Sequence, residues 1–198
     1  MIVIGVTGGI AAYKMCSVVS YLTSENHDVH VVMTESAKKF VSPMTFAALS
    51  HNPVIDDNTE WEPNGEIDHI LYSKATLLVI APATANTIAK IAHGMADNVL
   101  TSLALAFTGK IFIFPAMNVN MYENEITQKN MATLLAIKFK ELKDIEWPEE
   151  MPEESKIHRS SKYEIIVPVE GRLACGDVGR GKLPPTREII NKIKRYAV

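Results

Sequence analysis

Hydrophobic residues in this chain gather in short continuous runs, and longer segments with helical spacing separate the runs. Five runs end in small or turn-forming residues and predict strands at 1–6, 29–33, 77–80, 111–114 and 165–169. Continuous rather than alternating apolarity is typical of strands whose two faces are both covered. The helices expected between and after them lie at 11–24, 42–50, 86–93, 98–106, 127–136 and 186–196. This alternation predicts an α/β fold in which helices cover both faces of a parallel sheet.

Two segments break the alternation. Residues 140–156 hold seven acidic residues and two prolines, and we interpret the surrounding region, 139–162, as a solvated acidic insertion. A partner-binding arm is the alternative interpretation of that insertion. Residues 170–184 hold four glycines and one of the two cysteines. Because glycine at that density makes a poor helix and a poor strand, this segment is predicted to be a mobile loop.

Composition adds limits on the class of protein. The 198 residues are 47% hydrophobic and 22% charged, as in an ordinary globular protein, and they fit a single domain, 1–198. A net charge of −3 gives no electrostatic case for binding nucleic acid or an anionic membrane. Cys16 and Cys175 lack the spacing of a zinc site or a disulfide framework, which favours a reduced compartment. No apolar run is long enough for a signal peptide or a membrane span, so we expect a soluble cytoplasmic protein.

The loops that follow the first two strands carry small polar residues. In open parallel sheets, ligands bind in the crevice beyond the carboxyl ends of the strands. Thr7, Gly8 and Gly9 open a helix after the first strand, where they form either a phosphate site or a tight turn. After the second strand, Thr34 and Ser36 offer hydroxyl groups that either bind a ligand or cap a helix.

The loops after the third and fourth strands are richer in neutral polar side chains beside apolar ones. The polar residues concerned are Thr84, Asn86, Thr87, Asp97, Asn98, Asn118 and Asn120. Amides next to Met and Tyr suit a ligand that has an apolar ring and several hydrogen-bonding edges. Helix capping and turn formation are the alternative explanation for about a third of these residues, and the rest predict a binding site for such a ligand.

One histidine stands out by its position. His69 lies shortly before the third strand and its polar loop, and we consider it a catalytic candidate. The other histidines lack metal-ligand spacing and are expected in the core or at the surface; they are His27, His30, His51, His93 and His158. No metal site is predicted.

Taken together, these motifs resemble the homo-oligomeric flavin-containing cysteine decarboxylase family. The match runs in order through GVTGGIAAYK, VVMTESAKKFVSPMTFAALS, DHI, APATANTIAKIAHGMADN, PAMNVNMYEN and EGRLACGDVGRGKLP. It covers nearly all of the chain outside 139–162. The resemblance implies a three-layer Rossmann-like (flavodoxin-like) sheet with FMN at a subunit interface. It also implies a homo-oligomer, either a trimer or a dodecamer of trimers.

The resemblance also assigns roles to residues at matching positions. The implied FMN-binding residues are Gly8, Gly9, Thr34, Ser36, Phe40, Thr45, Phe46, Thr84, Asn86 and Thr87. The implied substrate-binding residues are Ala116, Met117, Asn118, Ala174 and Lys182, and 170–184 becomes a loop that covers the substrate. His69, Asn118 and Cys175 correspond to the catalytic residues of the family.

The implied reaction is FMN-dependent decarboxylation of 4′-phosphopantothenoylcysteine to 4′-phosphopantetheine in coenzyme A biosynthesis. Hydride transfer from the β-carbon to FMN, with loss of the thiol proton, gives a thioaldehyde, and loss of CO2 then gives an enethiolate. His69 would orient or deprotonate the thiol. Asn118 would hold the carboxylate through neutral hydrogen bonds, since a cation would favour the charged ground state. Reduced FMN would return the hydride and Cys175 would protonate the enethiolate, so that the reaction has no net redox change.

The chain departs from the family pattern in the covering loop. Lys182 stands where the family usually has Arg, and it keeps the charge but lacks the bidentate fork. Many bacterial relatives continue into a synthetase domain, and after the expected helix 186–196 that ligase activity is not expected here. The alternative functions are a peptidyl-cysteine decarboxylase and a non-catalytic flavoprotein regulatory subunit. A flavin prenyltransferase is not expected to carry His69, PAMN and Cys175 together.

Overall fold

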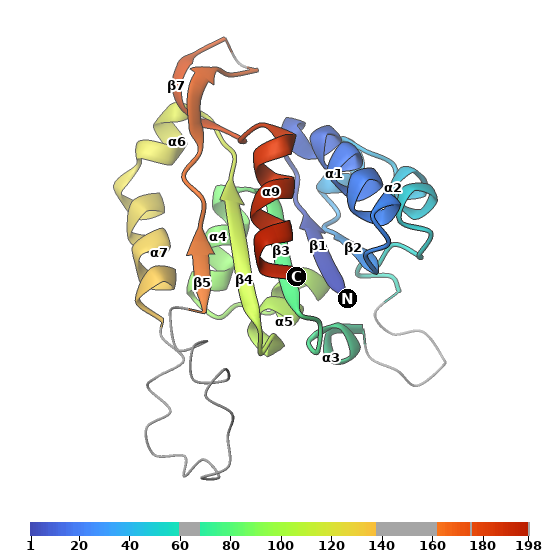
Figure 1. The fold of residues 1–198 in the computed structure, drawn as a ribbon. Helices are drawn as coiled ribbons and strands as arrows, with labels where there is room; N and C mark the ends of the chain where they lie inside the picture. Colours follow the sequence, from blue (N-terminus) through green and yellow to red (C-terminus); the bar gives the residue numbers. More distant parts are fainter. Residues whose placement is uncertain (60–67, 138–161, 175, 198) are drawn as a thin grey trace, which may run out of the picture.

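A five-stranded parallel sheet forms the centre of the molecule (Figure 1). This computed structural model describes residues 1–59, 68–137, 162–174 and 176–197, so Cys175 and most of the predicted acidic insertion lie outside the described residues. The strands are β1 (Ile2–Val6), β2 (Val29–Met33), β3 (Leu77–Ala83), β4 (Lys110–Pro115) and β5 (Tyr163–Ile165). Their order is β2-β1-β3-β4-β5, and all neighbouring pairs are parallel. This is the flavodoxin-like order, which confirms the predicted fold class.

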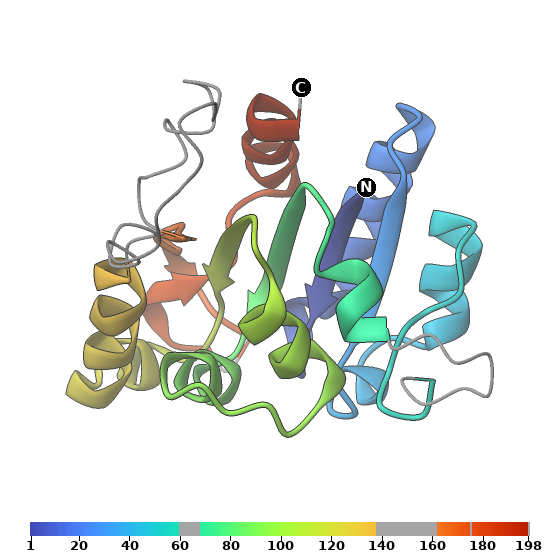
Figure 2. The same ribbon diagram turned by 90° about the horizontal axis from the view of Figure 1, so that it is seen from below.

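Helices cover both faces of the sheet (Figure 2). One face is covered by α1 (Tyr13–Ser24), α2 (Pro43–Ser50) and α9 (Thr186–Ala197). The other is covered by α4 (Ala85–Ala92), α5 (Val99–Ala106) and α7 (Glu125–Ala136). The shorter helices are η1 (Ile10–Ala12), η2 (Ala37–Lys39), α3 (Asp68–Tyr72), which packs against α5, and α6 (Val119–Glu123). No helix in the described ranges is long and apolar enough to cross a membrane.

The core divides into two hydrophobic clusters, one on each side of the sheet. Ile4 and Val6 of β1 belong to the cluster with α1, α2 and α9, whereas Val3 belongs to the cluster with α4, α5 and α7. All seven residues of β3 are buried. The continuous apolar runs of the sequence therefore arise because successive side chains enter different clusters.

The predicted position of the last strand of the sheet is wrong. The strand expected at 165–169 is found at Tyr163–Ile165. The N–H of Ile166 still donates to the carbonyl oxygen of Ile113, but the chain leaves the sheet before Pro168, which has no N–H to donate. Strand β6 (Val169–Arg172) begins directly afterwards.

The prediction that the glycine-rich segment forms no strand is also wrong. Strands β6 and β7 (Val178–Lys182) pair as an antiparallel ribbon that extends beyond the carboxyl end of the sheet (Figure 1). Gly181 has a φ of 144°, and a Cβ there would collide with the carbonyl oxygen of Met117. The N–H of Met117 donates to the carbonyl oxygen of Gly181 over 3.0 Å. Glycine at this position thus permits close docking of the ribbon.

Candidate active site

The loops after β1 and β3 are joined at the point where the strand order reverses. Thr7, at the end of β1, is 1% exposed. Its hydroxyl donates to the carbonyl oxygen of Pro82 over 2.7 Å and accepts from the N–H of Thr84 over 3.0 Å. In flavodoxin-like sheets this reversal is where ligands bind. The Thr7 hydroxyl is therefore used to join the two loops, whereas Gly8 and Gly9 line the adjacent space.

A cavity of about 700 Å³ lies at this end of the sheet. It brings together residues from four segments that the sequence singled out: Gly8, Gly9, Thr84, Ala116, Met117, Asn118, Ala174 and Lys182. These residues follow β1, β3 and β4 or belong to the β6–β7 ribbon. All five substrate-binding residues implied by the family resemblance thus line one space. That volume is within the usual range for a small-molecule site.

The charged residues of this larger cavity are all cationic. Lys14, Arg172 and Lys182 line it, and its described lining contains no Asp or Glu. Burial and the neighbouring charge of Lys182 lower the pKa of Lys14. Such a cavity favours an anionic ligand, which would relieve the repulsion between the cations. Lys14 and Arg172 were not predicted as site residues, although Lys14 lies within the GVTGGIAAYK motif.

A second cavity of about 420 Å³ adjoins the first. Its lining includes six of the residues predicted to bind FMN: Gly8, Thr34, Ser36, Thr84, Asn86 and Thr87. A Cβ on Gly8 would collide with Ser36, so glycine lets the loops after β1 and β2 touch. The hydroxyl of Thr34 is buried and has no hydrogen-bond partner in the described chain. An orphaned hydroxyl in the wall of a cavity suits a ligand with hydrogen-bonding groups.

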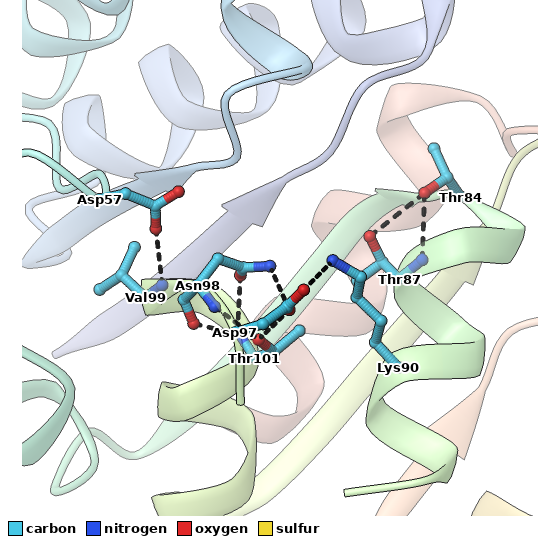
Figure 3. Close-up of polar contacts among 8 residues, drawn as sticks. All are labelled: Asp57, Thr84, Thr87, Lys90, Asp97, Asn98, Val99 and Thr101. Atoms are coloured by element: carbon cyan, nitrogen blue, oxygen red, sulfur yellow. Dashed lines mark hydrogen bonds and ion pairs between the residues drawn. The ribbon is translucent and has the colours of Figure 1, made fainter. Parts of the chain in front are cut away.

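An ion pair, helix caps and a side-chain hydrogen bond to the backbone fix one wall of the second cavity (Figure 3). Lys90 contacts Asp97 over 2.6 Å, and this hydrogen bond, with the charge of Lys90, lowers the pKa of Asp97. Asn98 caps α5, and the carboxylate of Asp57 accepts from the N–H of Val99 over 2.7 Å. Asp57 was missed at the sequence level because its partner lies 42 residues away.

Several of the predicted polar residues also begin helices. The Thr84 hydroxyl accepts from the N–H of Thr87 over 3.3 Å, and this contact caps α4. The Asn118 Oδ1 accepts from the N–H of Met121 over 3.0 Å and caps α6. Capping fixes the side-chain amide of Asn118, so that its Nδ2 points away from the helix. That nitrogen donates to Asp177 Oδ2 over 3.3 Å.

Four of the predicted site residues lie apart from both cavities. His69 is half-buried on α3, and Phe46 is fully buried in the cluster beneath α2. Phe40, just before α2, and Thr45, within α2, are exposed. Within the described ranges, none of the four lines either cavity. The structure therefore brings most of the predicted cofactor and substrate residues together, but it separates His69 from Asn118.

The chain matches known proteins over nearly its whole length. The family model described as Flavoprotein matches residues 1–197. A probable phosphopantothenoylcysteine decarboxylase of Streptococcus mutans is 41% identical over 196 residues, which are 98% of this chain and 96% of that protein. The bifunctional coenzyme A biosynthesis protein CoaBC of Bacillus subtilis is 38% identical over 192 residues. That match covers 96% of this chain but only 41% of the Bacillus protein.

Solved structures agree with the sequence relatives. A cysteine-to-serine mutant of PPC decarboxylase complexed with pantothenoylaminoethenethiol has a TM-score of 0.77 and 27% identity, with 99% of this chain and 97% of that chain covered. The FMN-dependent cysteine decarboxylase SpaF has a TM-score of 0.70 and 26% identity, with 100% and 97% covered. The family model covers residues 1–197, and the Streptococcus relative is 41% identical over nearly the whole chain. Both findings show the family of this chain, and the solved structures agree with them. The chain belongs to the Flavoprotein family.

Proposed function

We propose that the chain is an FMN-dependent carboxy-lyase that converts 4′-phosphopantothenoylcysteine to 4′-phosphopantetheine in coenzyme A biosynthesis. The observation that carries this proposal is the larger cavity, where the Gly8–Gly9 turn, Thr84, the PAMN segment and the β6–β7 ribbon meet. Its three cations suit a substrate that has both a phosphate and a carboxylate. The name of the Streptococcus relative supports this substrate. The name of the Bacillus relative supports a role in coenzyme A biosynthesis, from which we expect a cytoplasmic protein.

The second cavity fits FMN. The orphaned Thr34 hydroxyl and the exposed Ser36 and Asn86 offer hydrogen bonds to its polar chain, and Gly8 and Thr84 connect this cavity with the larger one. The Flavoprotein family and the FMN-dependent relative SpaF support this cofactor. When bound, FMN supplies a reversible hydride acceptor, which the protein side chains lack.

The residues of the chain would act on the substrate through position and proton transfer. Because Oδ1 of Asn118 caps α6, its Nδ2 is the group available to hold the substrate carboxylate. A neutral amide orients the carboxylate and stabilises its charge less than a cation would, so that loss of CO2 is not opposed. Lys14 and Lys182 would attract the anionic substrate. His69 near the thiol and Cys175 as the proton donor stay predictions from the sequence.

We also propose a homo-oligomer, a trimer or a dodecamer of trimers, with FMN at the interface between subunits. Large apolar side chains are exposed around the two cavities and on α2 and α3: Ile10, Tyr13, Phe40, Met44, Ile70 and Met121. Such residues favour burial against another subunit. His69 lines neither cavity within the described part of the chain, so a neighbouring subunit would bring it to Asn118.

The proposed activity is tested by CO2 release from 4′-phosphopantothenoylcysteine. The unmodified, FMN-loaded chain should release CO2, whereas Cys175→Ser should stall and accumulate the oxidised intermediate. A peptide that ends in cysteine is the control substrate and should release none. Absence of CO2 from the unmodified chain with the phosphorylated substrate would sink the proposal.

The shared site is tested by mixing inactive variants. His69→Asn and Asn118→Leu should each be inactive alone, and mixed oligomers should regain part of the activity because some sites receive both native residues. Light scattering should give the mass of a trimer or a multiple of it. A monomeric mass, or no recovery after subunit exchange, would contradict this arrangement.

A further inference from the structure

A carboxylate of the chain itself contacts the amide that we assign to the substrate carboxylate. Asp177 lies in the turn between β6 and β7, and its Oδ2 accepts from Nδ2 of Asn118 over 3.3 Å. The other side of the Asn118 amide is occupied, because Oδ1 accepts from the N–H of Met121. The amide therefore presents only its donor, and that donor contacts a carboxylate.

Backbone hydrogen bonds hold Asp177 in this place. The N–H of Leu173 donates to the carbonyl oxygen of Asp177 over 2.8 Å, which closes the turn. The ribbon docks on the PAMN segment through the bond between Met117 and Gly181. The position of Asp177 beside Asn118 thus follows from the docking of the whole ribbon.

The surroundings favour an anion at this position. Lys14, Arg172 and Lys182 line the same cavity as Asn118, and no carboxylate is among its described lining residues. The contact between Asn118 and Asp177 is exposed, but the Asn118 Nδ2 that Asp177 occupies cannot also hold a substrate carboxylate in the same place, and two carboxylates side by side would repel each other. A substrate carboxylate therefore competes with Asp177 for Asn118.

We propose that the carboxylate of Asp177 occupies the place of the substrate carboxylate in the ligand-free protein and leaves Asn118 when substrate binds. The proposal rests on the function proposed above, specifically on the role of Asn118. It makes Asp177 a residue that distinguishes substrate from product. A ligand that has lost its carboxylate leaves Asn118 free to bind Asp177 again, so that the contact weakens binding of the substrate and leaves binding of the decarboxylated product unchanged.

The test compares two ligands that differ in the carboxylate. The first is 4′-phosphopantothenoylserine, an unreactive substrate analogue with a hydroxyl in place of the thiol, and the second is 4′-phosphopantetheine. Dissociation constants are measured by calorimetry on the FMN-loaded chain and on Asp177→Asn and Asp177→Ala. Both variants should bind the serine analogue about three- to tenfold more tightly, the effect of removing one long, exposed competing hydrogen bond. Binding of 4′-phosphopantetheine should change less than about twofold.

Glu170→Gln is the matched control. Glu170 is a carboxylate of β6 in the same ribbon, so this variant makes the same change in net charge away from Asn118. Equal tightening by Glu170→Gln would assign the effect to long-range charge and overturn the proposal. Tightening of both ligands, no change, or weakening of either ligand by the Asp177 variants would overturn it as well. If the unmodified chain neither bound the analogue nor released CO2, the proposed function itself would fail.

Discussion

The two walls of the larger cavity are built in different ways. On one side, the loops after β1 and β3 are joined by the buried Thr7 hydroxyl, which bonds to Pro82 and Thr84. On the other side, the β6–β7 ribbon is largely exposed and docks through one backbone bond and the contact of Asn118 with Asp177. Damage to the first wall should thus affect folding and both cavities, whereas damage to the ribbon should affect the substrate alone.

The largest effect is expected from Thr7→Val, which keeps the shape of the side chain but removes its hydroxyl. The carbonyl of Pro82 and the N–H of Thr84 then lose their buried partner, which should lower the free energy of unfolding by about 2–4 kcal/mol. FMN affinity should fall by about tenfold, because both cavities share Thr84. Urea unfolding and quenching of FMN fluorescence measure the two effects.

Thr7→Ser is the matched control, since it retains the hydroxyl. It should keep most of the FMN affinity and lose only the stability that belongs to one buried methyl group, about 1 kcal/mol. If Thr7→Val bound FMN as well as Thr7→Ser did, the first wall would not depend on this hydroxyl.

A smaller effect, confined to the ribbon, is expected from Gly181→Ala. The added Cβ would collide with the Met117 carbonyl at a positive φ, and such strain costs about 1–3 kcal/mol. Because the ribbon can undock by itself, KM for the substrate should rise about tenfold or more while FMN affinity stays the same. Steady-state kinetics and FMN titration separate these quantities.

Gly176→Ala gives the comparison within the same ribbon. Gly176 also has a positive φ, 97°, but a Cβ there would meet nothing within 4 Å. It should therefore raise KM less than Gly181→Ala does. An equal rise would mean that backbone strain, rather than the contact with Met117, controls the docking of the ribbon.

The smallest effect is a pH dependence outside both walls, in the Lys38–Asp56 ion pair that joins η2 to the segment after α2. Burial alone would raise the pKa of Asp56, but hydrogen bonding and the charge of Lys38, 2.5 Å away, outweigh it and lower that pKa. The unfolded chain then binds more protons than the folded one as pH falls. The stabilisation is complete above the unfolded pKa of about 4 and is lost as pH falls through the lower folded pKa.

Asp56→Asn should accordingly lower stability at pH 7 by less than about 1 kcal/mol and flatten its decline toward pH 3. Urea unfolding at several pH values measures the slope of the free energy of unfolding against pH. Glu123→Gln removes an exposed carboxylate of α6 and should leave the slope nearly unchanged. An identical slope for Asp56→Asn and the unmodified chain would show that the pair with Lys38 does not contribute.

The sequence predicted the first wall better than the second. The apolar runs predict the strands, and the helical spacing predicts the helices between them. The loops after the strands contain Gly8, Thr34 and Thr84, which line the second cavity. The ribbon was missed because glycine content does not distinguish a free loop from a strand that packs closely on Met117. The partners of Thr7 and Asp57 lie 75 and 42 residues away, so local patterns carry no trace of them. His69 was singled out by its position before the third strand and then by the resemblance, and within the described chain it lines neither cavity.

Gly8, Thr84 and Met121 line both cavities, which makes them a common partition. A cofactor in the smaller cavity would form part of the boundary of the larger one, so redesign at the partition would alter both ligands at once. Arg172 and Lys182 line the larger cavity and are absent from the described lining of the smaller one. Substitutions in the ribbon can therefore change the substrate preference while the cofactor site keeps its residues.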